Sequence, residues 1–398
     1  MFSSLRVRNF QLYWVGMFIS LIGSWIQITA QSWLVFELTK SAFLLGLVSF
    51  LNLIPVFFLS LFGGVLADRI NKRNILIITQ NAFMILAFIL GYMTQAEIIT
   101  PKLIMIIALL NGIVMAFDAP SRQAMVVELV GKSHLMNAVA LNSLAFNSSR
   151  IIGPALAAIL VAGIGMYGCF YINGFSFIAV IAALMMIKNG KPDKINTGNS
   201  LLKDIKEALY YIKDNRIMLI LVAIVGVISL FGVSYVILMP VFARNVLGSG
   251  VKEFGKLMSA IGAGAILSTL LLAKLGDFKN KGKFLLFSLV MFSVSLILLS
   301  FTRQHLLAIA VLVFLGWGAV SATAIINTLL QDMVSDRLRG RVMSIFMFTF
   351  AGMMPFGNLV TGYLASVWDV SNAILFSGII CLVFSVYAGI FFPKLRSL

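Results

Sequence analysis

The charged residues best suited to carry chemistry in this chain form a short cluster between two long apolar segments. The cluster contains Gly64, Asp68, Arg69, Lys72 and Arg73, and so sets one carboxylate among three cations. A carboxylate at the end of an apolar segment needs cations or hydrogen-bond donors, because an unpaired charge beside hydrocarbon is costly. The spacing therefore predicts a network of ion pairs at this position.

A weaker copy of the cluster indicates that the chain arose by duplication. Asp277 and Lys281 lie 209 residues after Asp68 and Lys72, and Phe278 replaces the arginine between them. Two halves related by such a repeat are typical of transporters, with the substrate site between the halves. Other matched glycines are Gly46 with Gly255 at the same offset, and Gly153 with Gly357 at an offset of 204.

Three further charged residues stand within apolar segments or at their ends. Arg150 lies inside one, where it can receive an anionic group of a substrate or take part in ion coupling. The structural alternative for Arg150 is an ion pair or a bond to backbone carbonyls. Glu37 and Asp118 are the best-placed carboxylates for carrying a coupling proton. For Glu37 the alternative is a capping residue at the membrane interface.

A polar face in the first half and an apolar one in the second predict a cavity for an amphipathic substrate. Ser20 and Ser24 recur at helical spacing with two glutamines, so the four side chains share one helix face. The second half is rich in Phe and Met, which can form a deformable apolar wall. The residues expected to bind substrate are Ser24, Gln27, Gln31, Asn111, Asn147, Arg150, Trp317, Ser321, Asn327 and Phe346.

Membrane-spanning helices must position these residues. The chain of 398 residues is 61% hydrophobic and 11% charged, whereas soluble proteins contain about 25% charged residues. About 20 apolar residues are needed to cross the hydrocarbon core as a helix. The sequence predicts an all-α polytopic membrane protein with twelve transmembrane segments, at residues 13–36, 43–66, 75–93, 103–117, 138–162, 168–187, 218–241, 257–273, 284–301, 306–330, 342–367 and 373–392.

The distribution of the 30 Lys and Arg residues predicts the orientation. Most of them fall in cytoplasmic loops when both termini are placed inside the cell. The net charge of +16 then faces anionic lipid head groups, and no nucleic-acid partner is expected. The two Cys and two His residues are isolated, so neither a metal nor another cofactor is expected. We expect a monomeric, multi-pass protein of the cell (inner) membrane.

A polar stretch over residues 188–199 divides the chain. It is rich in turn-forming residues and predicts a cytoplasmic linker. Apolar residues then recur at helical spacing from Leu201 to Ile212, which predicts an amphipathic helix resting on the membrane. The expected organisation is a six-helix half over residues 1–187, a linker with this helix over 188–215, and a six-helix half over 216–398, the halves being related by a pseudo-two-fold repeat.

In these features the chain resembles the major facilitator superfamily over nearly its whole length. Residues 64–73 are similar to that superfamily's loop between the second and third helices, although Asn71 stands where a glycine is usual. Residues 118–124 and 339–344 resemble the efflux branch that includes the enterobactin exporter and macrolide efflux pumps. The resemblance implies alternating access between two six-helix halves, driven by protons or another ion gradient and without ATP.

Two departures from the superfamily's antiporter pattern stand out. Asn111 precedes a glycine in the fourth segment, but the arginine common before that pair is missing. Gly153 and Pro154 resemble the antiporters' Gly-Pro motif, yet Ala157 and Ala158 replace its glycine pair. Export is therefore not established by this motif alone.

The resemblance also implies a gate on the cytoplasmic side. The superfamily's equivalent of Asp68 meets the start of the eleventh helix, whose free N–H groups favour an anion. Asp118, expected at the end of the fourth helix, can accept hydrogen bonds from Arg69 or Arg73. The alternative is that these charges only set topology and loop shape. The expected gate residues are Gly64, Asp68, Arg69, Lys72, Arg73, Asp118, Arg122, Arg339 and Arg341.

The function that these features favour is proton-coupled or otherwise ion-coupled export of lipophilic or amphipathic small molecules, such as drugs or siderophores. A lysolipid flippase and a nutrient symporter of the same fold are alternatives. A membrane receptor that transports nothing is the alternative from another class. Catalysis is not expected, because no nucleophile with a base, no P-loop and no metal site is present in the sequence.

Overall fold

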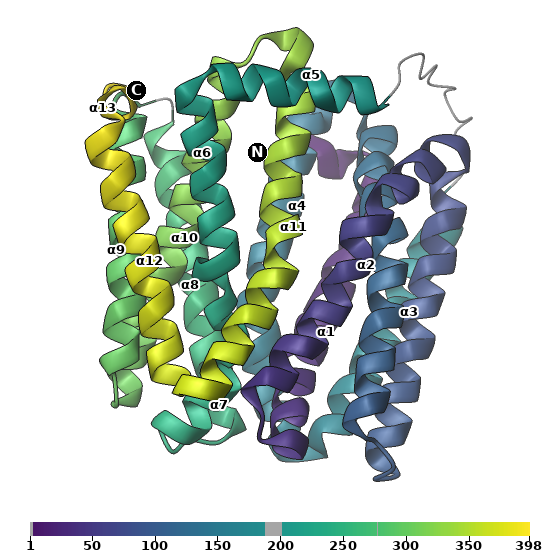
Figure 1. Cartoon of the computed structure of the whole chain (residues 1–398). Helices are drawn as coiled ribbons and strands as arrows, with labels where there is room; N and C mark the ends of the chain where they lie inside the picture. Colours follow the sequence, from purple (N-terminus) through teal and green to yellow (C-terminus); the bar gives the residue numbers. More distant parts are fainter. Residues whose placement is uncertain (1–2, 188–200, 277) are drawn as a thin grey trace. The chain divides into compact units, whose positions relative to one another are not determined.

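The computed structural model describes residues 3–187, 201–276 and 278–398, and all regular secondary structure in those ranges is helical (Figure 1). The predicted linker over 188–199, Asp277 and the side chain of Asp68 lie outside the described residues. The predicted all-α fold class is confirmed. The longer helices are α1 (Arg8–Thr39), α2 (Ala42–Arg69), α3 (Lys72–Gln95), α4 (Pro101–Met186), α5 (Leu201–Asp214), α6 (Arg216–Val227), α8 (Val251–Leu275), α9 (Lys281–Phe301), α10 (His305–Met333), α11 (Asp336–Trp368) and α12 (Val370–Phe391).

The predicted segments all lie in helices long and apolar enough to cross a membrane. The described residues contain eleven such helical stretches, because the fifth and sixth predicted segments share the stretch His134–Met186. Within α4 the backbone leaves the helical region at Gly131 (φ 62°, ψ −178°) and at Gly165 (φ 74°, ψ 175°). Glycine tolerates a positive φ because it has no Cβ, so three predicted segments follow one another in α4 with a kink between successive ones.

The predicted end of the fourth segment near Asp118 is wrong. The helical stretch Pro101–Gly131 continues well beyond that residue. Pro120 lies inside it, and a proline removes the hydrogen bond to the carbonyl four residues earlier. That carbonyl belongs to Ala116 and lies against Gly63 of α2. The carbonyl that Pro120 leaves without its helical hydrogen bond therefore faces a glycine of α2.

The seventh predicted segment is helical but irregular. After α6 the chain forms a π-helical turn (Ile228–Gly232), a 3₁₀ helix (Val233–Leu238), α7 (Met239–Val241) and a second π-helical turn (Phe242–Val246). Ser229 donates a hydrogen bond to the carbonyl of Phe350 in α11. Gly357 of α11 also lies against this irregular stretch, since a Cβ there would come within 2.2 Å of the Leu230 oxygen. Such departures from α-helical geometry are common where helices pack closely or bend.

The chain forms two compact units, and each takes one short segment from the other half of the sequence. The first unit comprises Met1–Lys40, Leu51–Asn196 and Gly250–Ser259. The second comprises Ser41–Phe50, Thr197–Ser249 and Ala260–Leu398. The offset of 209 residues carries Ser41 onto Gly250 and Phe50 onto Ser259, so the exchanged segments are equivalent in the repeat.

Glycines at equivalent positions make the contacts of these exchanged segments. A Cβ on Gly46 would lie 2.5 Å from the carbonyl oxygen of Asn358 in the second unit. A Cβ on Gly255 would lie 2.7 Å from the carbonyl oxygen of Pro154 in the first unit. The offset of 204 carries Pro154 onto Asn358, so both partners in one contact have counterparts in the other. The duplication predicted from sequence therefore extends to helix packing.

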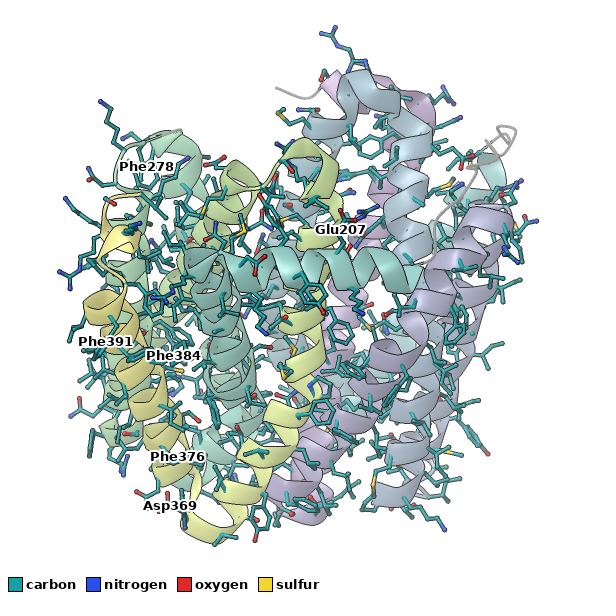
Figure 2. The ribbon with its side chains drawn as sticks, turned by 45° about the horizontal axis from the view of Figure 1, so that its top comes forward. Glu207, Phe278, Asp369, Phe376, Phe384 and Phe391 are labelled. Carbon is teal, nitrogen blue, oxygen red and sulfur yellow. The ribbon has the colours of Figure 1, made fainter. Side chains whose placement is uncertain are left out.

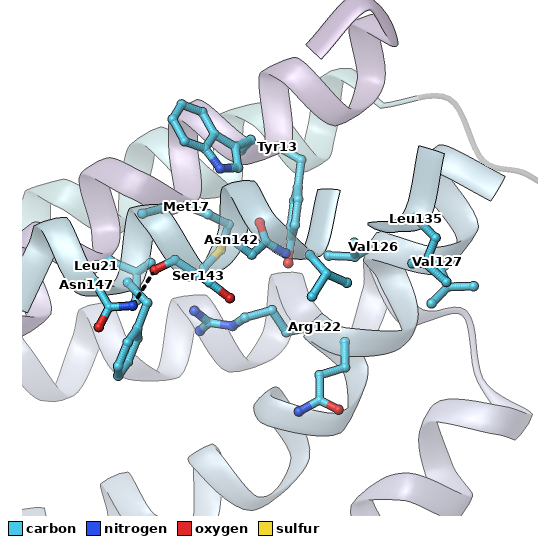
Figure 3. Close-up of a pocket in the computed structure, with 15 residues that line it drawn as sticks. Tyr13, Met17, Leu21, Arg122, Val126, Val127, Leu135, Asn142, Ser143 and Asn147 are labelled. Carbon is cyan, nitrogen blue, oxygen red and sulfur yellow. Dashed lines mark hydrogen bonds between the residues drawn. The ribbon is translucent and has the colours of Figure 1, made fainter. Parts of the chain in front are cut away.

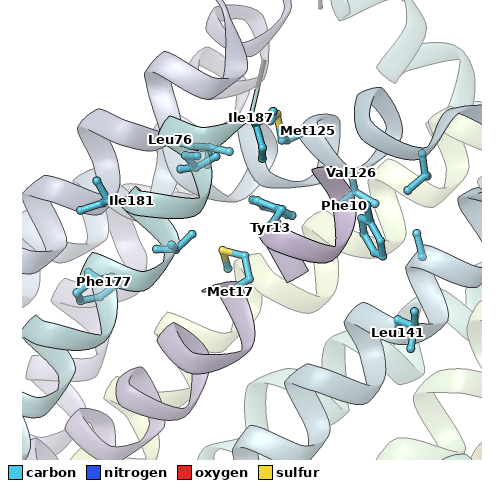
Figure 4. Packing of buried hydrophobic residues seen from close by; sticks show 14 of the residues in the cluster. Phe10, Tyr13, Met17, Leu76, Met125, Val126, Leu141, Phe177, Ile181 and Ile187 are labelled. Carbon is cyan, nitrogen blue, oxygen red and sulfur yellow. The ribbon is translucent and has the colours of Figure 1, made fainter. Parts of the chain in front are cut away.

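The first unit contains a cluster of buried apolar side chains contributed by α1, α3 and α4 (Figure 4). Phe10, Tyr13 and Met17 recur along α1 at helical spacing and contact this cluster from one face. Leu76 of α3 and Phe177 of α4 belong to the same cluster. Packing of this kind holds membrane helices together through van der Waals contact. It also fixes the helices that carry the charged site described next.

Candidate functional site

Asp118 lies at the centre of a buried hydrogen-bond network in the first unit. The residue is 2% exposed, and Oδ1 accepts hydrogen bonds from Thr79 Oγ1 at 2.8 Å and from Gln80 Nε2 at 2.7 Å. Oδ2 accepts from Nε of Arg122 at 3.0 Å and from Nη2 of the same guanidinium, which forms an ion pair with Asp118. Four charge-assisted hydrogen bonds offset the cost of burying the ionised carboxylate.

The partners of Asp118 differ from those expected. Arg69 or Arg73 was expected to donate to its carboxylate, but Arg122 occupies that place. The fourth helix continues past Asp118, so Arg122 follows it by four residues and lies on the same helix face. Thr79 and Gln80 were not identified from the sequence. Their signal was the run of three polar residues, Thr79 to Asn81, inside the apolar third segment.

Arg73 and Lys72 connect the start of α3 to two places on α4, one at its end and one just before the kink at Gly131. Arg73 donates from Nε to the carbonyl of Leu184 at 2.5 Å and from Nη2 to that of Met185 at 3.0 Å. These carbonyls belong to the last turn of α4, where a cation is favourable. Lys72 Nζ lies 3.3 Å from a carboxylate oxygen of Glu128. Both cations therefore fasten helices within the first unit.

Three other expected gate residues, Arg69, Arg339 and Arg341, lie close to the ends of their helices. Arg69 ends α2 and is exposed. Arg339 is exposed on α11, and Arg341 of the same helix forms an ion pair with Glu207 of α5. Figures 1 and 2 show α5 lying across α11 in the second unit, with Glu207 labelled. The predicted amphipathic helix is thus tied to the start of α11 by a charged pair that the sequence did not indicate.

Gly63 and Gly64 are adjacent in the motif but have opposite surroundings. A Cβ added to Gly63 would lie 2.2 Å from the carbonyl oxygen of Ala116, whereas a Cβ on Gly64 would meet no atom of the described residues within 4 Å. Gly64 was the glycine selected from the sequence. In this structure Gly63 is the residue that allows α2 and α4 to approach closely.

We expect Gly63→Ala and Gly64→Ala to have opposite effects on stability. Gly63→Ala should lower the free energy of unfolding by about 1–3 kcal/mol, because the added methyl overpacks the α2–α4 contact. Gly64→Ala should leave it unchanged or raise it by up to about 1 kcal/mol, because alanine is the better helix former. Unfolding of the two purified variants in detergent measures the difference. Equal destabilisation by both substitutions would contradict this packing.

A cavity of about 600 Å³ lies beside Arg122 within the first unit (Figure 3). Its walls come from α1 and from two stretches of α4, on either side of the kink at Gly131. Of the predicted substrate-binding residues, Asn147 lines this cavity. The other lining residues with polar groups were not identified as binding residues from the sequence; they are Tyr13, Trp14, Arg122, Gln123, Asn142 and Ser143.

Arg150 lies on α4 one turn beyond this cavity's lining residues. Its guanidinium carbon is 5.9 Å from the ring centroid of Trp25 in α1, a distance at which a cation and an aromatic face attract. The close approach of these helices depends on Gly153, where a Cβ would come within 2.3 Å of Trp25 Cβ. The structure therefore gives Arg150 an aromatic neighbour within the first unit.

One side chain of the polar face predicted on the first segment bonds to another helix of its own unit. Gln27 is buried and accepts a hydrogen bond from Asn173 of α4 at 2.7 Å. Gln27 in turn reaches Gln31 at 3.5 Å, and Ser24 donates to the carbonyl of Ser20 at 2.8 Å. The bond between Asn173 and Gln27 joins α1 to the last part of α4, so Gln27 also has a role in helix packing.

Two predicted binding residues on α10 contact neighbouring helices in the second unit. The ring of Trp317 makes edge-to-face contacts with Phe284 and Phe287 of α9, at centroid distances of 5.8 and 6.0 Å. Ser321 is fully buried, and its hydroxyl lies 2.8 Å from that of Ser268 in α8. The structure therefore places both side chains in contacts between helices of one unit.

The remaining polar candidates bond within their own helices. Asn327 accepts from Gln331 at 2.6 Å, and Asn111 donates to the carbonyl of Ile107 at 3.1 Å. Phe346 is 4% exposed. Glu37 is exposed near the end of α1 and accepts from Nε1 of Trp33 at 2.9 Å. Glu37 therefore has a hydrogen-bond donor within its own helix.

Comparison with known proteins gives consistent matches over the full length. A family model described as transmembrane secretion effector matches residues 1–397. The chain is 29% identical to the staphyloferrin A transporter of Staphylococcus aureus, with 93% of each chain covered. It is 23% identical to the multidrug efflux pump Tap of Mycolicibacterium fortuitum, covering 94% of this chain and 93% of that one. It is 24% identical to macrolide efflux protein A of Streptococcus pyogenes, with 94% of each covered.

A solved structure supports the fold independently. The D-xylose-proton symporter superimposes with a TM-score of 0.77 at 13% sequence identity, covering 97% of this chain and 99% of that one. At this identity the likeness shows the arrangement of helices alone. The resemblance to the superfamily found in the sequence, and to its efflux branch, is confirmed by these matches taken together.

Proposed function

Because the chain belongs to the transmembrane secretion effector family of the major facilitator superfamily, we propose that this transporter exports lipophilic or amphipathic small molecules in exchange for protons. The chain is a multi-pass membrane transporter and not an enzyme. Relatives named as efflux pumps support the outward direction. We place both termini in the cytoplasm, since the basic residues then gather on the cytoplasmic side.

Asp118 is the observation that carries the proposal of proton coupling. Among the described residues it is the only carboxylate buried to below a tenth of its surface. A buried ionisable residue in a membrane helix is a functional candidate by default. Protonation would remove the charge of Asp118 and weaken its ion pair with Arg122. Proton binding would then change the position of the Arg122 guanidinium beside the cavity. Glu37 and Arg150 remain further candidates for coupling.

Conformational change would involve the charged clusters at the helix ends. We assign the cytoplasmic gate to the motif around Asp68 and to the start of α11 at Arg339 and Arg341. Lys72 and Arg73 support the assignment because their contacts join the start of α3 to α4. The pair of Arg341 with Glu207 would carry movement of α11 to the amphipathic helix α5.

Transport by everted membrane vesicles tests the proposed function. Vesicles containing the protein should accumulate a radiolabelled macrolide, or staphyloferrin A, when a proton gradient is imposed with the lumen acidic. A protonophore should abolish the accumulation, and vesicles lacking the protein should show none. Accumulation only in right-side-out vesicles would instead indicate a nutrient symporter. Movement of fluorescent lysolipid between leaflets, without movement of the other two compounds, would indicate a flippase.

A further inference from the structure

The hydroxyl of Thr79 lies within hydrogen-bond distance of two acceptors but has one hydrogen to donate. Its Oγ1 is 2.8 Å from Oδ1 of Asp118 and 3.1 Å from the backbone carbonyl oxygen of Leu76, three residues earlier in α3. A threonine hydroxyl supplies one donor and two acceptor lone pairs. Both contacts are buried, so the hydroxyl hydrogen points to one of these two oxygens at a time.

The charge of Asp118 decides which oxygen receives this hydrogen. An ionised carboxylate accepts a hydrogen bond about twice as strong as the bond that a neutral carbonyl accepts. While Asp118 is ionised, Thr79 therefore donates to Oδ1. The Leu76 carbonyl lies inside α3, where it also accepts a hydrogen bond of the helix itself.

A protonated Asp118 needs an acceptor for its own O–H, and Thr79 is the neighbour that can supply one. Oδ2 faces Nε and Nη2 of Arg122, and a guanidinium has donors but no acceptor. Oδ1 faces the Thr79 hydroxyl and Nε2 of Gln80, which is also a donor. The hydroxyl is thus the one group hydrogen-bonded to this carboxylate, within the described part of the chain, that can change from donor to acceptor by rotation.

Two other polar groups near Asp118 are less suited to accept the proton's hydrogen bond. Oε1 of Gln80 is buried and has no partner among the described residues. To use it, the amide would have to turn over and give up the bond from Nε2 to Asp118. Tyr13 on α1 interacts electrostatically with Asp118 and Arg122, but its hydroxyl makes no hydrogen bond to any described residue.

We propose that Thr79 is a positioning residue for the coupling proton, because its hydroxyl reverses its hydrogen bond when Asp118 changes charge. With Asp118 ionised, Thr79 donates to Oδ1. With a proton from solution on Oδ1, Asp118 donates to Thr79, and Thr79 donates to the Leu76 carbonyl at the distance already present. This hydroxyl switch gives Oδ1 a partner in both charge states without moving a heavy atom of Thr79. The inference rests on the proposed proton coupling and assigns the oxygen that carries the proton.

Infrared difference spectroscopy of the purified full-length protein tests the hydroxyl switch. Lowering the pH should produce the carbonyl band of a protonated carboxyl group, and Asp118→Asn should lack this band. Thr79→Ser keeps the hydroxyl, so the band should keep its position. Thr79→Val keeps the branched shape of the side chain but removes the hydroxyl. Its band should move to higher frequency, as expected of a carboxylic acid with one hydrogen bond fewer.

Thr94→Val is the matched control on the same helix. The Thr94 hydroxyl donates to the carbonyl of Leu90 at 2.7 Å, and no carboxylate of the described residues bonds to it. This substitution should leave the Asp118 band unchanged. Thr79→Ala removes the same hydroxyl as Thr79→Val without its bulk, and it should move the band in the same direction. An unmoved band in Thr79→Val or Thr79→Ala, or no band in the unmodified protein, would overturn the inference.

Failure of this inference can be separated from failure of the proposed function. The band is recorded at equilibrium without a gradient, whereas export is measured in vesicles under one. Export of the macrolide, with a band that Thr79→Val does not move, would refute the role of Thr79 and leave the function standing. The expected band positions without export in vesicles would refute the function and leave the hydroxyl switch standing.

Discussion

Asp118→Asn is expected to abolish proton-driven export and to destabilise the protein. The substitution keeps the size of the side chain but removes the charge that Arg122 pairs with. An uncompensated guanidinium then remains beside buried residues, which typically costs about 3–5 kcal/mol. The asparagine amide has one acceptor oxygen and one donor nitrogen. Its nitrogen would therefore face other donors, either Thr79 and Gln80 on one side or Arg122 on the other. Unfolding in detergent and accumulation of substrate by everted vesicles measure the two effects.

A second substitution separates stability from coupling. Adding Arg122→Gln to Asp118→Asn removes both charges, so most of the lost stability should return, whereas export should not. Asp332→Asn is the control for loss of a carboxylate from an ion pair, because Asp332 is half exposed where it pairs with Lys281. That change should alter the free energy of unfolding by less than about 1 kcal/mol. Export by the Asp118→Asn variant at the normal rate would refute its role as proton carrier.

Gly46→Val and Gly255→Val are expected to impair export by similar amounts. Each glycine belongs to an exchanged segment, and a Cβ would lie 2.5 Å from the Asn358 carbonyl in one case and 2.7 Å from the Pro154 carbonyl in the other. Overpacking of this kind costs about 1–3 kcal/mol. We expect the two variants to lose similar stability, because the repeat makes their contacts equivalent.

Gly163→Ala is the control for these valine variants. Gly163 also lies in a helix, but a Cβ there meets no atom of the described residues within 4 Å. Its stability and its rate of export should match those of the unmodified protein. Thermal unfolding and vesicle export are measured on all three variants. A large loss in Gly46→Val with none in Gly255→Val would show that the duplicated contacts have diverged in function.

Much of the fold could be predicted from sequence because its causes are local. A hydrocarbon phase requires every backbone polar group to be paired within its own helix, so a long apolar segment predicts a spanning helix wherever it occurs. The duplication could also be recognised from the sequence. Gly46 and Gly255 occupy equivalent positions of the repeat, and each makes a close helix contact that requires a glycine. The break between the fifth and sixth segments was also visible, and the structure locates it at Gly165.

The partners of charged side chains could not be predicted in the same way. The sequence singled out Asp118, yet hydropathy could not show that Thr79 and Gln80 face it from α3. Arg122 was expected in the gate, but the mistaken helix end near Asp118 concealed that the two residues share one helix face. Such pairings depend on the rotation and register of helices far apart in the chain.

The sequence by itself determined the membrane-spanning helices, the duplication and the family, because composition, apolar length and repeated motifs are properties of the chain read in order. Only the tertiary structure decided which polar residues meet: Asp118 with Arg122, and Arg341 with Glu207. The physical reason is that a polar side chain in an apolar helix must find a partner, while its choice of partner is made by the packing of the helices around it.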